Sequence, residues 1–127
     1  MTIKQLQKKS IQYRKNILKY IFHANAGHTG GSLSCIDILN VLYNDTMNVS
    51  PENFRSPDRD RYIQSKGHSV EALFVVLADK GFFPVKFLDI DRLFELDVIE
   101  RMNAVAFLVG GRCAKNVRRV LGLTDNV

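Results

Sequence analysis

The sequence predicts a mainly α-helical chain with one or two short strands. Three segments carry apolar residues at helical spacing, glycine-containing turns separate them, and only one short run between them has the composition of a strand. With 127 residues, of which 46% are hydrophobic and 24% charged, the chain is long enough for one domain around one core. This composition argues against disorder and against a disulfide scaffold.

The first predicted element is a long amphipathic helix. Thr2 followed by Gln5 fits a capping box, and apolar residues at helical spacing continue from Ile3 to Phe22, so we expect the helix to run until Gly27. This segment has no acidic residue and six basic ones: Lys4, Lys8, Lys9, Arg14, Lys15 and Lys19. Such a patch can attract nucleic acid or phosphorylated ligands, or it can be the solvated face of a helix.

The second predicted helix follows a glycine-rich turn. Gly27, Gly30 and Gly31 interrupt regular structure, and Ser34, three residues before Asp37, is the expected start of the helix. Its apolar positions include Ile36, Leu39, Leu42 and Tyr43.

A surface loop over residues 48–60 leads to the third predicted helix. Residues 61–64 form the expected short strand, residues 65–68 turn the chain, and the helix spans 71–80 before Gly81 closes it. The order strand, glycine turn, helix suits phosphate binding, because the first N–H groups of a helix have no partner inside it and carry partial positive charge.

The last part of the chain has a different pattern. We expect one or two helices after Pro84, with a second short strand around residues 105–109 and a frayed end. Cys35 and Cys113 are far apart and belong to no cysteine and histidine cluster, so no metal site or redox pair is predicted. No apolar stretch is long enough to span a membrane and no leader pattern precedes the first helix, so we expect a cytoplasmic protein without a membrane partner.

Two histidines in glycine-containing turns are the candidate functional residues. His28 lies in Gly-His-Thr-Gly-Gly-Ser and His68 in Ser-Lys-Gly-His. Histidine titrates near neutral pH and can transfer protons or bond phosphate oxygens, and glycine lets the backbone approach a ligand closely. A structural role for each histidine stays open, and compensation of the helix dipole explains Glu71 in the third helix.

The two segments that contain these histidines resemble a known protein family. KSIQYRKNILKYIFHANAGHTGGSLSCIDILNVLY, followed by PDRDRYIQSKGHSVEALFVVLADKGFFP, resembles the opening of the transketolase family, particularly the N-terminal subunit of split bacterial transketolases. The resemblance runs from Lys9 to about Pro84. It implies the α/β fold of a thiamine diphosphate-binding domain, of which residues 1–86 are the opening part and residues 87–127 a divergent, helical tail.

The resemblance also implies a cofactor and roles for the two turns. It places His68, on its Gly67 turn, against the diphosphate of thiamine diphosphate, which the family binds with magnesium, and Ser65 and Lys66 shape that turn. It makes His28 an active-site residue that touches sugar hydroxyls and assists proton transfer. Thr29 stands where many relatives have proline, a change that loosens the turn.

Other features of the family pattern are absent from this sequence. No GDG motif, which in the family holds magnesium and the diphosphate, occurs here, and Gly110-Gly111-Arg112 lacks the carboxylate that a hard cation requires. A further histidine segment and the pyrimidine-binding domain are also missing. We therefore predict no metal ligands and no activity for this chain alone, and retention of the cofactor is in question. A truncated, frameshifted or rearranged product, or a short protein with a replaced tail, would give this pattern.

The resemblance and the residues leave three functional hypotheses. The first is thiamine diphosphate-dependent transfer of a two-carbon ketol unit between sugar phosphates, with 1-deoxyxylulose-5-phosphate synthase as a related interpretation. The second is a non-catalytic remnant or docking module that forms a homodimer or joins a partner C-terminal subunit. Nucleic-acid binding is the least supported, because no nucleic-acid-binding motif accompanies the basic residues.

Overall fold

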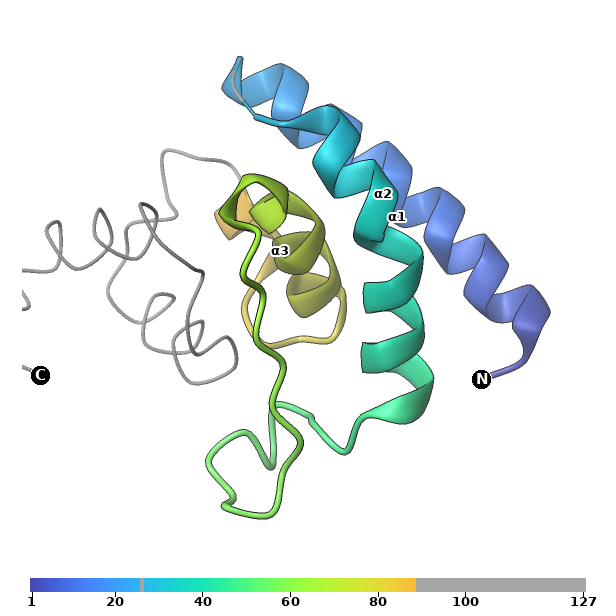
Figure 1. Ribbon diagram of the computed structural model, residues 1–127, viewed down its shortest axis with the longest axis vertical. Coiled ribbons are helices and arrows are strands. Elements are labelled where there is room, and N and C mark those ends of the chain that lie inside the picture. The colour runs from blue at the N-terminus through green and yellow to red at the C-terminus, as the bar shows by residue number, and fades with distance from the viewer. Residues whose placement is uncertain (26, 89–127) are drawn as a thin grey trace, which may run out of the picture.

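Three helices pack against one another in the computed structural model, which describes residues 1–25 and 27–88 (Figure 1). They are α1 (Ile3–Ala24), α2 (Thr29–Val41) and α3 (Val70–Asp79). A π-helical turn, η1 (Leu42–Thr46), extends α2, and 3₁₀ turns precede and follow α3 as η2 (Gly67–Ser69) and η3 (Val85–Leu88). No helix in the described ranges is long and apolar enough to cross a membrane.

The predicted start of α1 is confirmed. Thr2 Oγ1 accepts a hydrogen bond from the Gln5 N–H at 3.3 Å, and Gln5 Oε1 accepts one from the Thr2 N–H at 2.8 Å. This reciprocal capping box satisfies two helix-start N–H groups. The helix ends at Ala24, and Asn25 in the left-handed region (φ 49°) turns the chain toward α2.

The core lies between the three helices. Ile17 of α1, Ile36 and Leu39 of α2, and Leu73 and Val76 of α3 are fully buried. α3 is apolar around most of its circumference because it is covered on several sides, and six of its residues are buried: Ala72, Leu73, Val75, Val76, Leu77 and Ala78.

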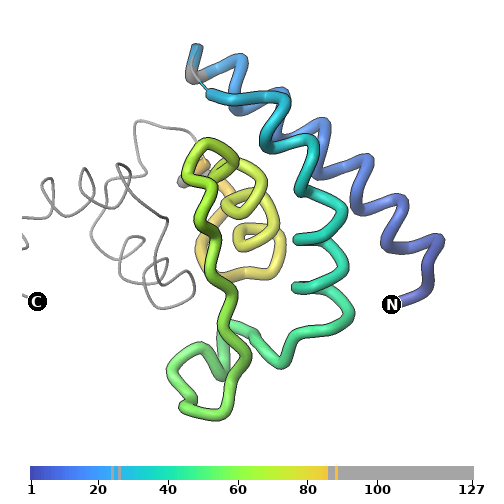
Figure 2. The backbone as a smooth tube through the Cα atoms, in the orientation of Figure 1, coloured from blue at the N-terminus to red at the C-terminus, as the bar shows by residue number. Residues whose placement is uncertain are grey.

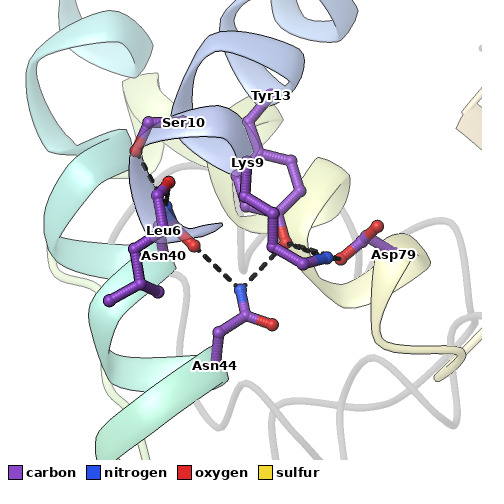
Figure 3. Close-up of polar contacts among 7 residues, drawn as sticks. All are labelled: Leu6, Lys9, Ser10, Tyr13, Asn40, Asn44 and Asp79. Atoms are coloured by element: carbon purple, nitrogen blue, oxygen red, sulfur yellow. Dashed lines mark hydrogen bonds and ion pairs between the residues drawn. The ribbon is translucent and has the colours of Figure 1, made fainter. Parts of the chain in front are cut away.

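A polar network joins the three helices beside this core (Figure 3). The Tyr13 hydroxyl donates to Asp79 Oδ2 at 2.6 Å and accepts from Asn44 Nδ2 at 3.0 Å, and Lys9 pairs with the same carboxylate. Asn40, buried in α2, donates through Nδ2 to the Ser10 hydroxyl (2.8 Å) and to the Leu6 carbonyl (2.7 Å) of α1. The polar groups of this network therefore have partners, as buried polar groups require.

Two of the basic side chains of α1 contact acids from other helices. Besides Lys9, Arg14 donates two hydrogen bonds to the Asp37 carboxylate of α2, at 2.9 and 2.7 Å. The Arg14 guanidinium, followed by the Ser10 hydroxyl, lowers the pKa of Asp37 to about 2. Only part of the basic patch is therefore left as an unpaired, solvated surface.

Two sequence predictions are wrong in their details. α2 begins at Thr29 rather than near Ser34, because Gly30 and Gly31 occupy its first turn, where a helix tolerates glycine. Residues 61–64 are extended, but no strand forms anywhere in the described ranges, since these residues pair with no neighbouring strand. The predicted strand at 105–109 and the helical tail lie outside the described residues, and the α/β fold is supported by family alone.

Candidate functional site

The two histidine turns meet at one corner of the helical assembly. His28 immediately precedes α2, and His68 lies in η2, which contacts α2 before the chain enters α3. The two imidazole centroids are 4.6 Å apart with an interplanar angle of 80°, an edge-to-face contact. Both side chains are exposed. Figure 2 shows the extended stretch that carries the second turn up to the start of α2.

The start of α2 is open beside this pair. An added Cβ at Gly30 would meet nothing within 4 Å, and one at Gly31 would lie 3.6 Å from Lys66 Nζ and 3.5 Å from the His68 carbonyl oxygen. The Ser32 N–H bonds the His28 carbonyl (3.2 Å), so the N–H groups before it in the helix have no partner inside it. The corner thus combines two imidazoles, one ammonium group and a helix start.

A buried glutamine holds the second turn in shape. Gln64, 5% exposed, donates through Nε2 to the Lys66 carbonyl (3.1 Å) and to the Ser69 hydroxyl (3.2 Å). The Ser69 hydroxyl in turn donates to the Lys66 carbonyl (3.1 Å), and Tyr62 donates to Gln64 Oε1 (3.2 Å). Sequence reasoning missed Gln64 because it placed this residue in a strand, and no local pattern distinguishes a glutamine that closes a turn.

A carboxylate joins the first turn to α3. Glu71, in the first turn of α3, accepts a hydrogen bond from the Ser32 hydroxyl at 2.7 Å, and Ser32 is fully buried. The other oxygen, Oε1, lies 2.9 Å from the position that a Cβ would take at Gly27. The helix-dipole explanation of Glu71 is therefore incomplete, because its side chain has a specific partner.

Comparison with known proteins identifies the family. The profile described as "Transketolase, thiamine diphosphate binding domain" matches residues 7–99, well over half of the chain. The chain belongs to this transketolase family. The matched range extends beyond residue 86, where the resemblance of the motifs ends.

Curated relatives support the same assignment. The chain is 45% identical over 82 residues to one of the subunits of the apulose-4-phosphate transketolase of Phocaeicola vulgatus, covering 65% of this chain and 29% of that protein. It is 44% identical over 84 residues to the 6-deoxy-6-sulfo-D-fructose transketolase subunit SqwG of a Clostridium species, covering 66% of this chain and 30% of that protein. It is 37% identical over 59 residues to human transketolase, covering 46% of this chain and 10% of that protein. The chain thus spans about three tenths of the length of the first two relatives.

The residues at the corner fit the diphosphate end of the family's cofactor. Imidazole N–H groups, the Lys66 ammonium and the N–H groups at the start of α2 are all donors, and the open space at Gly30 lets an anion approach the backbone. The described residues include no group of three His, Cys, Asp or Glu side chains that could hold a metal. The transketolase-family corner therefore suits an anion and supplies no magnesium cage of its own.

Proposed function

We propose that this chain provides the opening part of the thiamine diphosphate-binding subunit of a transketolase-like enzyme, with His68 at its diphosphate site and His28 beside it as an active-site residue. The contact between the two imidazoles carries the proposal. Their ring centroids are 4.6 Å apart, although the two histidines are forty residues apart in the sequence. The contact holds His68 beside Lys66 and the open start of α2, and several donors converging on a helix start suit a diphosphate group.

Each residue of the corner has a distinct role in this proposal. His68, supported by Gly67 and by the Gln64 hydrogen bonds, donates to a phosphate oxygen, and Lys66 adds positive charge beside it. His28 bonds sugar hydroxyls and holds or releases a proton at its ring nitrogen. Bound thiamine diphosphate supplies the nucleophilic carbon for transfer of a two-carbon ketol unit between sugar phosphates.

A calorimetric titration tests the diphosphate site. Thiamine diphosphate with magnesium, and inorganic diphosphate alone, would be titrated into wild type, His68→Ala and His23→Ala. His23 is an exposed histidine in the last turn of α1 and serves as the matched control. We expect His68→Ala to weaken binding of both ligands about tenfold or more and His23→Ala to leave it unchanged. Equal binding by all three proteins would contradict the proposal.

We also propose that the chain alone does not catalyse ketol transfer. The described residues offer no cluster of three His, Cys, Asp or Glu side chains for a metal and the sequence contains no GDG motif, so the magnesium that neutralises a diphosphate would need other ligands. An assay of the pure chain with ketose and aldose phosphates in the presence of thiamine diphosphate and magnesium tests this. Measurable ketol transfer that depends on His28 would overturn it.

A second function, docking on a partner protein, is favoured by an apolar stripe on the outer face of α1. Ile11, Leu18 and Phe22 are 56%, 47% and 80% exposed, and their spacing of seven and four residues places them on one helix face. We infer that the remaining subunit of a split transketolase covers this stripe. Without that subunit the stripe brings two copies together, so sedimentation velocity at rising concentration should show association, and a strict monomer would count against docking.

A further inference from the structure

One carboxylate bonds the far end of the His28 turn and lies near its beginning. Glu71 Oε2 accepts the Ser32 hydroxyl at 2.7 Å, four residues after His28, and Glu71 Oε1 lies against Gly27, the residue before His28. Glu71 itself follows His68 by three residues, in the first turn of the helix that His68 leads into. Besides the ring contact and the close approach of Gly31 to Lys66 and His68, the Glu71 side chain therefore gives the two histidine turns a third connection, through a side-chain hydrogen bond.

The position of the Glu71 carboxylate depends on glycine at position 27 and on the Ser32 hydroxyl. Gly27 has a φ of 137°, and a Cβ there would lie 2.9 Å from both Glu71 Oε1 and Ile21 Cγ1. Ser32 is fully buried, so its hydroxyl would lose its only described partner if the carboxylate moved away. A buried hydroxyl without a partner is unfavourable, which favours one position of the carboxylate over alternatives.

We propose that Glu71 and Ser32 form a positioning pair that sets the separation of His28 and His68. The pair links the start of α2 to the start of α3, and each histidine lies within four residues of one member. The pair does not touch the ligand; it acts through the two imidazoles. Its effect on diphosphate affinity rests on the proposed function, whereas its effect on the ring contact does not.

Three variants distinguish the effect of the Glu71 hydrogen bond from the effect of its negative charge. A carboxylate in the first turn of α3 also compensates the helix dipole, and that role needs charge alone. Glu71→Gln removes the charge but keeps an oxygen that can accept from Ser32, whereas Glu71→Ala removes both. Ser32→Ala leaves the charge in place and removes the donor.

Nuclear magnetic resonance of the histidine ring protons gives the decisive readout. In wild type, an edge-to-face contact at 4.6 Å should give cross-relaxation between the His28 and His68 rings and ring-current shifts of their protons. We expect Glu71→Ala and Ser32→Ala each to lose the cross-relaxation, the double variant to lose no more than either single one, and Glu71→Gln to keep it.

Affinity for inorganic diphosphate gives a second readout. Glu71→Ala and Ser32→Ala should each bind about tenfold more weakly than wild type, and Glu71→Gln within about twofold. Glu52→Gln, at an exposed loop position, controls for the loss of one charge, and Thr46→Val, at an exposed position of η1, controls for the loss of one hydroxyl. Circular dichroism should show wild-type helix content in every variant compared.

The two proposals fail in different ways. If wild type binds no diphosphate while the ring contact responds to the variants as described, the diphosphate site is wrong and the positioning pair stands. If Ser32→Ala keeps both the ring contact and wild-type affinity, the positioning pair is overturned even when the diphosphate site is confirmed. Ser32→Ala removes a single oxygen atom, so it remains informative should Glu71→Ala fail to fold.

Discussion

Two buried tyrosines differ in what their hydroxyl groups contact. The Tyr13 hydroxyl donates to Asp79 and accepts from Asn44, whereas the buried hydroxyl of Tyr43 has no hydrogen-bond partner among the described residues. Burial, and next the Asp79 carboxylate, raise the pKa of Tyr13, while burial and the nearby Tyr62 raise the pKa of Tyr43. Both tyrosines therefore stay protonated at neutral pH.

The pair gives a matched prediction for stability. Tyr13→Phe removes a donor to a carboxylate and should lower the free energy of unfolding by about 1–3 kcal/mol. Tyr43→Phe removes a hydroxyl that gains nothing from its described surroundings and should leave stability unchanged or slightly higher. Urea unfolding at pH 7 measures both, and equal losses in the two variants would contradict the network in Figure 3.

Asp37 gives a prediction for pH dependence. Its pKa is lowered to about 2 by Arg14 and Ser10, so the carboxylate binds protons less readily in the folded chain than in the unfolded one. The stabilisation is complete above the unfolded pKa and is lost as pH falls from about 4 toward 2. Because the Asp37 side chain is 61% exposed, we expect less than about 1 kcal/mol.

Asp37→Asn tests this sign. Relative to wild type, the variant should be less stable at pH 7, and the difference should shrink as pH falls below about 4. Asp58→Asn, in an exposed turn, is the control and should show no difference at either pH. A difference for Asp37→Asn that grows on acidification would contradict the assignment.

At the scale of the element, two glycines around the start of α2 differ in whether a side chain could replace them. Gly27 has a positive φ and no room for a Cβ, whereas Gly30 lies within the helix and faces open space. Gly30→Ala should raise the free energy of unfolding by about 0.5–1 kcal/mol because alanine favours the helix. Gly27→Ala should lower it by more than about 1 kcal/mol through backbone strain and the clash with Glu71 and Ile21.

Thermal unfolding followed by circular dichroism measures both glycine variants. Gly30→Ala would also narrow the open helix start, so its diphosphate affinity should fall while its stability rises. Stabilisation by Gly27→Ala would show that the turn before His28 does not have the described conformation.

Sequence patterns correctly predicted the helices whose ends are determined by neighbouring residues in the sequence. The capping box located the start of α1, and the apolar periodicity with a closing Gly81 located α3. The predicted start of α2 was wrong because Gly30 and Gly31 were interpreted as interruptions, while the structure places them in the first helical turn, where Gly31 passes close to Lys66 and His68. The strand at 61–64 was wrong because a strand needs a partner, and the described residues contain no neighbouring strand for it.

The candidate site could be predicted residue by residue but not as an arrangement. His28 and His68 each stand out in the sequence by their glycine neighbours, whereas their contact depends on how α2 packs against η2 and α3. Ser32 and Glu71 are thirty-nine positions apart, so only the packing of two helices reveals their bond. Whether His28, Gly67 and His68 act as proposed stays a prediction.

At the scale of the whole molecule, burial divides α1 into two faces with different roles. Ile17 is fully buried in the core, whereas Phe22, just over one turn further along the helix, is 80% exposed. A face that is apolar and exposed contributes nothing to the packing of the chain, and large exposed apolar patches are typical of protein interfaces.

Phe22→Ser should therefore change association without changing the fold. Its free energy of unfolding should stay within about 0.5 kcal/mol of wild type, as for other exposed positions, while the concentration at which the chain associates rises. Ile17→Ser places a hydroxyl in the core and should lower stability by about 3 kcal/mol or more. Sedimentation velocity and urea unfolding measure the two effects separately. If Phe22→Ser associates as wild type does, the outer face of α1 is a solvated surface and the docking function loses its support.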